Sequence, residues 1–440
     1  MSMRTAAFLA AALLGLSACA RVRPAAPSAP AQALQRAAIA ATTPDSRRDI
    51  VLAVANPLAP PPMHAGSNLL GYAASKHYVA GQHAASTVDA LARQYGLHEI
   101  AAWPIKPLGL YCAVLEPPPG VSRDKLIEAL ARDGRVQLAQ PLQSFSVYSS
   151  ASTDGPAGTR RYNDPYVGLQ RGFIATDAGA AQRFALGRGV DVAVVDTGVD
   201  ASHPDLQGRI LGTHDLVDAG AGGASRDHHG TEVAGIIAAD RNNHLGIVGM
   251  APEAMLSVYK ACWYPPDGGG AGIARCDSFT LAKALAAVID TPARIVNLSL
   301  GGPADPLLHR LLVQLLNQGR IVIAAMPPSG RLDGFPDDTP GVIVVRSSGA
   351  SEAPPGVLSA PGDDILTTQP NGGYDFTSGT SMAAAHVSGI VALLLSMSPN
   401  LDAGSVHDLL LRTSKTTDGM LQVNAHAAVD ALRGAHEIPR

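Results

Sequence analysis

Short apolar runs rich in β-branched residues alternate with helical segments through the second half of the chain, and this alternation limits the fold more than any other feature. The runs predict strands at 190–198, 256–262, 294–300, 320–326 and 341–348. Segments with helical spacing predict helices at 230–240, 279–290, 307–319 and 380–398. Because the strands are apolar at consecutive positions, both of their faces must be covered, as in parallel sheets that lie between two layers of helices. The sequence therefore predicts a three-layer α/β fold with a mainly parallel sheet.

The composition indicates a folded chain and argues against nucleic-acid binding. Of the 440 residues, 46% are hydrophobic and only 16% are charged, so the chain can bury a large core. The formal net charge is −4, and no run of basic residues is available to follow a phosphate backbone. We therefore expect no nucleic-acid partner.

The first residues have the organisation of a secretion signal. Arg4 precedes an apolar stretch at 6–16, which is too short to cross a membrane. Residues 16–19 read LSAC and resemble the bacterial lipobox, in which the signal is cut before the cysteine and that cysteine carries the lipid. We expect a signal peptide at 1–18 and acyl chains on Cys19 that hold the protein to a membrane, the outer membrane in a Gram-negative host. A general signal peptide with an incidental cysteine is the alternative.

The rest of the chain divides into four segments. Residues 19–48 are rich in alanine and proline without periodicity, which is typical of a tether. Residues 49–148 combine two helical patterns with several strand-like runs and predict a small α+β domain. Residues 149–160 are rich in turn-forming residues and predict an exposed linker at which the chain could be processed. The α/β pattern belongs to residues 161–440.

Export would place the remaining cysteines in a compartment where disulfides persist. Cys262 and Cys276 flank a stretch rich in proline and glycine, and their closeness favours a disulfide that closes the loop. Two cysteines are poor evidence for a metal site, and we predict none. Cys112 lies in an apolar segment and is interpreted as a buried small hydrophobic residue.

Three polar side chains stand where predicted strands end or helices begin, which is where open α/β sheets collect their functional groups. Asp196 ends the first predicted strand, His229 opens a helix and Ser381 opens the long helix. A helix start presents backbone N–H groups and a positive dipole end, so an anion that develops beside Ser381 would be stabilised. Each motif is weak alone, and D-T-G also marks aspartic peptidases, but the chain has no second D-T/S-G. In the order Asp, His, Ser, the three residue types suit acyl transfer.

Five segments across residues 187–431 resemble the diagnostic blocks of the subtilase family of serine peptidases: DTGVDASHPDL, HGTEVAGIIA, NLSLGG, SAPGDDILTT and SGTSMAAAHVSG. The resemblance implies a subtilisin-like fold and endopeptidase chemistry on extended polypeptides. It implies that Ser381 is the nucleophile, that His229 is the general base and acid, and that Asp196 orients and stabilises the imidazolium. His228 is interpreted as a solvated loop residue.

Two further segments resemble parts of subtilases. Ser299-Leu300-Gly301 resembles the strand edge that pairs with the substrate backbone, with an ordinary strand exit as the alternative. Residues 49–148 resemble the subtilisin propeptide, a ferredoxin-like domain that inhibits the enzyme and assists its folding. An unrelated small α+β domain is the alternative. If the resemblance holds, the chain is made as a zymogen and its own propeptide is a partner of its peptidase domain.

One departure concerns the stabilisation of the oxyanion. Subtilases usually carry an asparagine in A-A-G-N-x-G, whereas 324–330 reads AAMPPSG, and by position Pro328 replaces the asparagine. Loss of this donor from subtilisin itself costs about 10²–10³ in turnover. The sequence thus leaves two hypotheses: a working serine endopeptidase, and a degenerate subtilase that binds peptides or partners and cleaves weakly or not at all.

Two further expectations concern calcium and release from the membrane. Residues 242–246 resemble a calcium-binding loop of some subtilisins, but they hold few acidic residues, so we expect no required cofactor and only weak support for calcium. The predicted lipid lies on the amino side of the propeptide-like domain. A cut within 149–160 would therefore release the peptidase domain from its membrane anchor.

Overall fold

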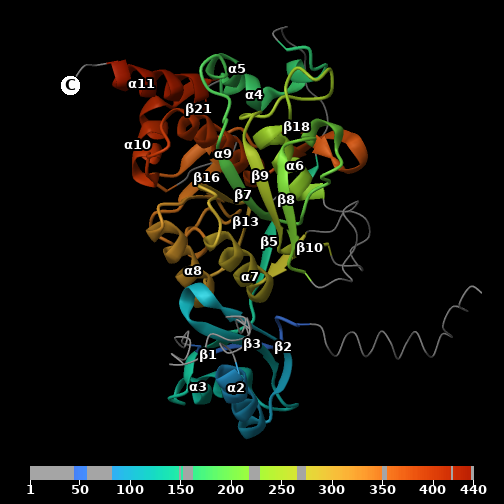
Figure 1. The fold of residues 1–440 in the computed structure, drawn as a ribbon, viewed down its shortest axis with the longest axis vertical. Helices are drawn as coiled ribbons and strands as arrows, with labels where there is room; N and C mark the ends of the chain where they lie inside the picture. Colours follow the sequence, from blue (N-terminus) through green and yellow to red (C-terminus); the bar gives the residue numbers. More distant parts are fainter. Residues whose placement is uncertain are drawn as a thin grey trace, which may run out of the picture. The chain divides into compact units, whose positions relative to one another are not determined.

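The computed structural model describes residues 44–56, 82–147, 150–151, 162–217, 228–264, 274–348, 354–417 and 420–437, with elements labelled as in Figure 1. These all belong to a compact unit of residues 44–440, which is separate from residues 1–43. The predicted signal peptide, Cys19 and most of the predicted tether and linker lie outside the described residues.

A seven-stranded sheet forms the centre of the fold, and every neighbouring pair of its strands is parallel. In spatial order the strands are β17 (Leu358–Ala360), β16 (Ile343–Ser347), β14 (Ile321–Ala325), β12 (Ile295–Leu298), β7 (Asp191–Asp196), β9 (Met255–Lys260) and β8 (Ile210–Asp215). The predicted parallel sheet is therefore confirmed. The sequence missed β8, because its side chains are mostly exposed and lack an apolar run.

Helices cover both faces of this sheet (Figure 1). One face packs on α4 (Arg171–Ala175), α5 (Ala178–Ala181), α6 (His228–Ala238), α9 (Thr380–Met397), α10 (Ala403–Thr413) and α11 (Ala425–Glu437). The other face packs on α7 (Ser278–Ile289) and α8 (Pro306–Asn317). Strand β7 shows why: Val192 and Val194 join the first core, whereas Ala193 and Val195 join the second. Consecutive apolar residues thus supply both faces, and the three-layer prediction is confirmed.

Helix α9 is the one helix among the described residues that is long and apolar enough to cross a membrane. Within the protein, 83% of its apolar window is buried, so it behaves as the central helix of a core. Its first turn carries Ser381, which therefore stands on one of the most firmly packed elements of the fold.

Residues 50–141 form the small α+β domain. Its elements follow the order β1 (Ile50–Ala55), α2 (Gln82–Tyr95), β2 (His98–Ile105), β3 (Leu110–Glu116), α3 (Arg123–Ala131) and β4 (Val136–Pro141). Its antiparallel sheet has the strand order β2-β3-β1-β4, which is the βαββαβ arrangement of ferredoxin-like domains. Ile50, Leu52 and Val54 of β1 face α2 and α3. Val51 and Ala53, on the other face, share a core with α7 and α8. Alternate side chains of β1 thus pack into two different hydrophobic cores.

Shorter strands complete the fold and surround the candidate site. A five-stranded sheet contains β10 (Cys262–Trp263), β11 (Arg275–Asp277), β5 (Ser144–Val147), β13 (Leu300–Pro303) and β15 (Gly334–Phe335), in this spatial order. A three-stranded sheet contains β18 (Ile365–Gln369), β19 (Gly373–Ser378) and β6 (Ser150–Ala151). Strands β20 (Lys415–Thr417) and β21 (Met420–Gln422) form a hairpin.

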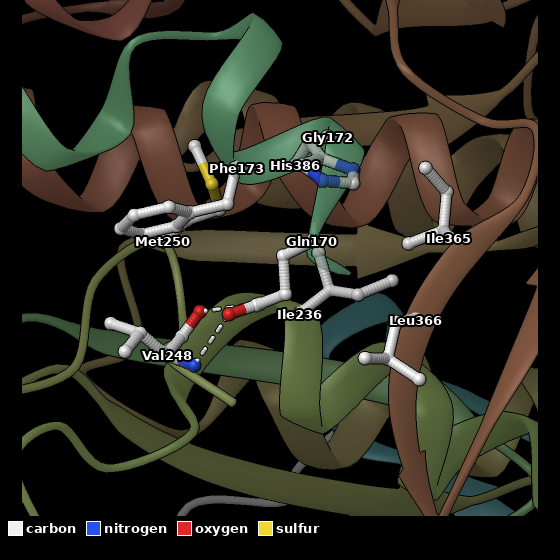
Figure 2. A pocket seen from close by; sticks show the side chains of 9 residues that line it. All are labelled: Gln170, Gly172, Phe173, Ile236, Val248, Met250, Ile365, Leu366 and His386. Carbon is white, nitrogen blue, oxygen red and sulfur yellow. Dashed lines mark hydrogen bonds between the residues drawn. The ribbon is translucent and has the colours of Figure 1, made fainter. Parts of the chain in front are cut away.

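A cavity of about 10 Å³ lies beside α9, with room for roughly one water molecule (Figure 2). Gln170 lines the cavity and forms two hydrogen bonds with the backbone of Val248. Burial lowers the pKa of His386, which also lines the cavity, to about 4, so this ring is neutral at neutral pH. The cavity is a packing gap and is too small for a peptide.

Candidate active site

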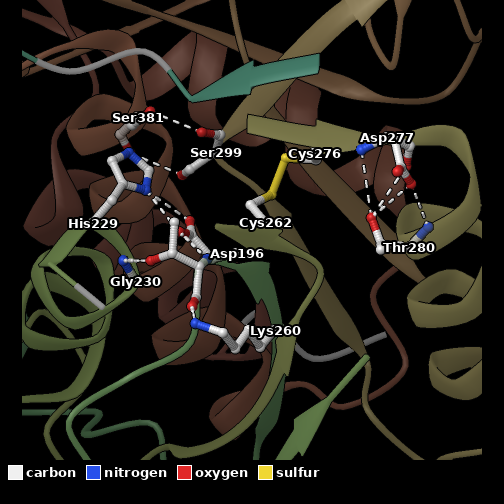
Figure 3. The surroundings of a disulfide bond; sticks show 11 residues. Asp196, His229, Gly230, Lys260, Cys262, Cys276, Asp277, Thr280, Ser299 and Ser381 are labelled. Atoms are coloured by element: carbon white, nitrogen blue, oxygen red, sulfur yellow. Dashed lines mark hydrogen bonds and ion pairs between the residues drawn. A yellow bond between two sulfur atoms is a disulfide. The ribbon is translucent and has the colours of Figure 1, made fainter. Parts of the chain in front are cut away.

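The three predicted catalytic side chains come together at one edge of the parallel sheet (Figure 3). Asp196 ends β7, and His229 and Ser381 are each the second residue of a helix, α6 and α9. The Nδ1 atom of His229 lies 2.8 and 2.9 Å from the two carboxylate oxygens of Asp196. All three residues are at most 1% exposed, so their interactions are shielded from water.

The buried carboxylate controls the protonation of the histidine. Burial alone would lower the pKa of His229, but the charge of Asp196, its hydrogen bond and the charge of Glu232 together outweigh burial and raise that pKa. Asp196 therefore stabilises the imidazolium form, which is what a base needs when it takes a proton during a reaction.

The other ring nitrogen of His229, Nε2, is buried and has no hydrogen-bond partner among the described residues. The hydroxyl of Ser381 donates to the carbonyl oxygen of Ser299 at 2.9 Å. Ser299 in turn donates its own hydroxyl to the Ser381 carbonyl at 3.1 Å. The Ser381 hydroxyl must therefore turn away from Ser299 before His229 can accept its proton. The structure brings the three residues together with this hydrogen bond still to be formed.

Two glycines allow the strand that carries Asp196 and the helix that carries His229 to approach each other. A Cβ atom added to Gly230 would lie 1.9 Å from the carbonyl oxygen of Gly198, which is far inside van der Waals contact. The Gly230 N–H also donates to the Thr197 hydroxyl at 3.0 Å. The glycines of D-T-G and H-G-T thus permit the contact that places His229 beside Asp196.

We expect Gly230→Ala to destabilise the protein by about 3 kcal/mol or more, because the added methyl group meets rigid backbone. Gly134→Ala is the matched control, since a Cβ there meets nothing within 4 Å. Urea unfolding monitored by circular dichroism measures both variants. Equal midpoints for Gly230→Ala and the wild type would contradict the close-contact argument.

The predicted substrate edge is occupied by a strand of the same chain. In β13, Leu300 pairs with Val147 and Gly301 pairs with Ser146, and both belong to the antiparallel strand β5. On its other side β5 pairs with β11, where Cys276 lies opposite Phe145. The segment 144–147 is therefore the middle strand of a three-stranded arrangement, held by backbone pairing along both edges.

The chain is paired again beyond residues 148–149, which lie outside the described residues. Ser150 pairs with Ser378 and Ala151 pairs with Thr377, in the last part of β19. Ser378 stands three positions before Ser381 in sequence. The segments 144–147 and 150–151 are thus both held by backbone pairing, the first to β13 and β11 and the second to the end of β19.

Sequence reasoning did not single out the aromatic residue that anchors β5. Phe145 is 1% exposed, and its ring meets the ring of Phe335 edge to face at 5.4 Å between centroids. A Cβ added to Gly302 would lie 2.4 Å from the Phe145 ring, so the glycine makes room for it. The alternation of apolar and polar residues at 144–147 is the signal that could have found this strand.

Two cysteines lie on the strands that continue this sheet beyond β5. Cys262 in β10 and Cys276 in β11 are joined by a disulfide, and the two residues face each other across the strand pair. Cys112 is buried, and burial raises the pKa of its thiol to about 12, so it is inert as a nucleophile.

The segment 326–330, which was expected to stabilise the oxyanion, has no side-chain amide that could donate a hydrogen bond. Met326 uses its N–H on the carbonyl of Val345, and Gly330 uses its N–H on Pro327. Pro327, which follows Met326 after the end of β14, is half-buried, whereas Pro328 is exposed in the turn that follows. Neither proline has a backbone N–H or a side-chain donor. The donor predicted to be missing at Pro328 is therefore missing at Pro327 as well.

One hydroxyl beside the nucleophile in sequence has no hydrogen-bond partner among the described residues. Thr380 immediately precedes Ser381, and its Oγ1 atom is buried without a hydrogen-bond partner among the described residues. A buried donor of this kind is available for a charge that develops beside Ser381.

The loop that resembles a calcium site is held by hydrogen bonds. The carboxylate of Asp205 accepts from the Ile247 N–H at 2.9 Å, from the Asn243 side chain at 2.7 Å and from the Tyr374 hydroxyl at 3.0 Å. Among the described residues, no group of three or more His, Cys, Asp or Glu side chains could hold a metal ion. His228 is exposed, as predicted, but it is the first residue of α6 and not part of a loop.

Comparison with known proteins agrees with this geometry. The profile of the subtilase family, peptidase S8, matches residues 187–431, which is more than half of the chain. A thermophilic serine proteinase from Bacillus sp. (strain AK1) is 37% identical over 63% of this chain and 67% of that protein. Thermitase from Thermoactinomyces vulgaris is 34% identical over 53% of this chain and 85% of that protein.

Among solved structures, the chain resembles fervidolysin from Fervidobacterium pennivorans, described as a keratinolytic enzyme related to subtilisin. The TM-score is 0.67 at 24% identity, over 87% of this chain and 61% of fervidolysin, and this likeness shows the fold. The matched family profile, the relatives and the fold agree, and the chain belongs to the subtilase family of serine endopeptidases.

Proposed function

We propose that this chain is a self-processing serine endopeptidase that hydrolyses extended polypeptides through an acyl-enzyme on Ser381. The observation that carries the proposal is the backbone pairing of the chain's own segments, 144–147 with β11 and β13 and 150–151 with the end of β19, three positions before Ser381. Backbone pairing of this kind gives affinity for an extended polypeptide strand.

The reaction follows from the geometry of the three side chains. His229 Nε2 accepts the proton of the Ser381 hydroxyl while Ser381 Oγ attacks the scissile carbonyl, and Asp196 stabilises the imidazolium that forms. His229 then gives the proton to the leaving amine, and water hydrolyses the acyl-enzyme by the same route. The N-terminus of α9 and the Thr380 hydroxyl supply donors for the oxyanion.

The first substrate of the enzyme is its own linker. The bond that is cut first lies between Val147, where β5 ends, and Ser150, where β6 begins. This position is at the amino end of the predicted linker 149–160. Cleavage there would separate residues 49–148 from the peptidase domain.

Residues 49–148 act as the propeptide of this enzyme. The face of the four-stranded sheet that carries Val51 and Ala53 shares a hydrophobic core with α7 and α8. Trp103 meets Phe279 of α7 edge to face, with 4.3 Å between ring centroids. This apolar contact would hold the propeptide on the peptidase domain and keep β5 between β11 and β13, where an extended substrate would bind.

The precursor is exported and anchored through lipid on Cys19, in the outer membrane if the host is Gram-negative. This part of the proposal is supported by the signal and lipobox patterns at 1–19. Because the anchor lies on the amino side of the propeptide, self-processing releases the peptidase domain from the membrane.

A second function is favoured by one observation. Pro327 and Pro328 stand where subtilases supply an amide donor, so the alternative is a subtilase that binds peptides along the edge of β13 and cleaves them weakly. Such a protein would serve as a peptide- or partner-binding module.

Labelling with a fluorophosphonate separates the two functions. We expect the folded wild type to carry one adduct on Ser381, because reaction requires a serine activated by His229. The urea-unfolded wild type and folded Ser381→Ala are the controls, and neither should be labelled. A folded wild type without an adduct would favour the binding module.

A further inference from the structure

The backbone N–H of His229 has an acceptor that the motifs of the sequence do not reveal. His229 is the second residue of α6, so its N–H belongs to the first turn, where helices lack internal partners. The Tyr264 hydroxyl oxygen accepts this N–H at 3.1 Å. We propose that Tyr264 is a positioning residue for His229 and that the Cys262–Cys276 disulfide places it. The proposal rests on His229 acting as the general base of the proposed function.

Three contacts fix the start of α6 relative to the end of β7 and to Tyr264. Asp196 holds the ring of His229 through Nδ1, Tyr264 holds its backbone nitrogen, and Thr197 holds the next residue through the Gly230 N–H. Asp196 and Thr197 both lie at the end of β7 and fix the helix from one side. Tyr264 directly follows β10, so it adds a constraint that β7 does not supply.

The disulfide determines where Tyr264 can lie. Cys262, Trp263 and Tyr264 are consecutive, and β10 is only two residues long, so two backbone pairs alone hold it against β11. The covalent bond from Cys262 to Cys276 closes this strand pair (Figure 3). Tyr264 is therefore anchored two residues from a covalent link.

The same link reaches the strand that lies between β11 and β13. Cys276 stands opposite Phe145 of β5, so one cysteine of the disulfide lies beside β5. The other cysteine, Cys262, lies two residues before Tyr264, which contacts His229. The disulfide and Tyr264 therefore connect β11, which pairs with β5, to the general base His229. Loss of the Tyr264 hydroxyl leaves the edges of β11 and β13 in place and affects the orientation of His229.

The first test separates turnover from binding. A fluorogenic peptide with the sequence of residues 144–148, SFSVY, is hydrolysed by protein that has been incubated to complete processing. We expect Tyr264→Phe to lower kcat about tenfold with KM changed less than about twofold, because a small displacement of a general base slows the reaction without weakening binding. Tyr162→Phe is the control, since it removes a hydroxyl bond to Gln182 outside the site. A wild-type kcat for Tyr264→Phe would overturn the proposal.

A second test does not require activity. In the Ser381→Ala background, the proton on His229 Nδ1 that is shared with Asp196 gives a far-downfield proton resonance. We expect Tyr264→Phe to shift or broaden this resonance and Tyr162→Phe to leave it unchanged. An unchanged resonance in Tyr264→Phe would contradict the positioning role. If wild-type protein failed to cleave the peptide, the proposed function would fail, and this resonance would still decide the role of Tyr264.

The disulfide is tested by a double-mutant cycle. We expect the Cys262→Ala/Cys276→Ala variant to lose part of kcat, and Tyr264→Phe to cause a smaller loss in that variant than in the wild type. Such coupling arises when two changes disturb the same contact. Losses that simply multiply would show that the disulfide does not place Tyr264.

Discussion

Asp196→Asn lowers kcat/KM by about 10⁴ at neutral pH while the protein remains folded, because an amide at this position holds the wrong tautomer of His229 and cannot stabilise its cation. The reaction needs a ring whose Nε2 is free to accept a proton. With asparagine, the side-chain NH₂ group donates to Nδ1 and leaves the proton of the neutral ring on Nε2. Peptide hydrolysis by the variant, with circular dichroism to verify folding, measures the loss. A reduction of less than about tenfold would contradict this role for the carboxylate.

The same variant has a predictable pH dependence. Neutral His229 is the active form, and Asp196 raises the pKa of His229 against the effect of burial, so wild-type activity falls as pH decreases through that raised pKa. Asparagine removes the charge and leaves burial, which lowers the pKa. The residual activity of Asp196→Asn should therefore persist to lower pH than that of the wild type. Rates of hydrolysis from about pH 5 to pH 9 test this, and an unchanged acid limb would contradict the electrostatic argument.

An asparagine in the oxyanion segment raises kcat by up to about 10²-fold, since removal of such a donor from subtilisin costs about 10²–10³. We expect a larger gain from Pro327→Asn than from Pro328→Asn, because position 327 is half-buried two residues after β14 and position 328 is exposed. KM should change little, because the donor acts on charge that appears only in the transition state.

The matched controls are Pro327→Ala and Pro328→Ala, which remove each ring without adding a donor. Their kcat values should remain near the wild-type value. If alanine raised kcat as much as asparagine at the same position, release of the proline would explain the gain and the oxyanion account would be wrong. If neither asparagine raised kcat, the missing donor would already be replaced by another group, and Thr380 would be the first to examine.

The central sheet could be predicted from the sequence because its strands are buried on both faces. Strands such as β7 and β14 contain uninterrupted apolar runs, and helix α9 is apolar on every side. Strand β8 could not be found in this way, since it is an exposed edge strand whose position depends on pairing with β9. Periodicity reports burial, and it fails where backbone pairing alone defines a strand.

Some residues of the candidate site could also be predicted from the sequence, and others could not. Asp196, His229 and Ser381 were predicted, because each stands in a short motif at the end of a strand or the start of a helix. Tyr264 and Phe145 were not, because their contacts depend on the register of β10, β11 and β5, which are distant in sequence. The hydrogen bond from Ser381 to Ser299 was also beyond the sequence, since it depends on one side-chain torsion.

The most direct test of the account is the intact mass of purified protein that begins at Ala20, compared with Ser381→Ala after folding and incubation at neutral pH. We expect the wild type to be cut at a bond between Val147 and Ser150 and the variant to remain whole. A folded wild type that stays uncut, or a cut at this position that persists in Ser381→Ala, would contradict self-processing by this site.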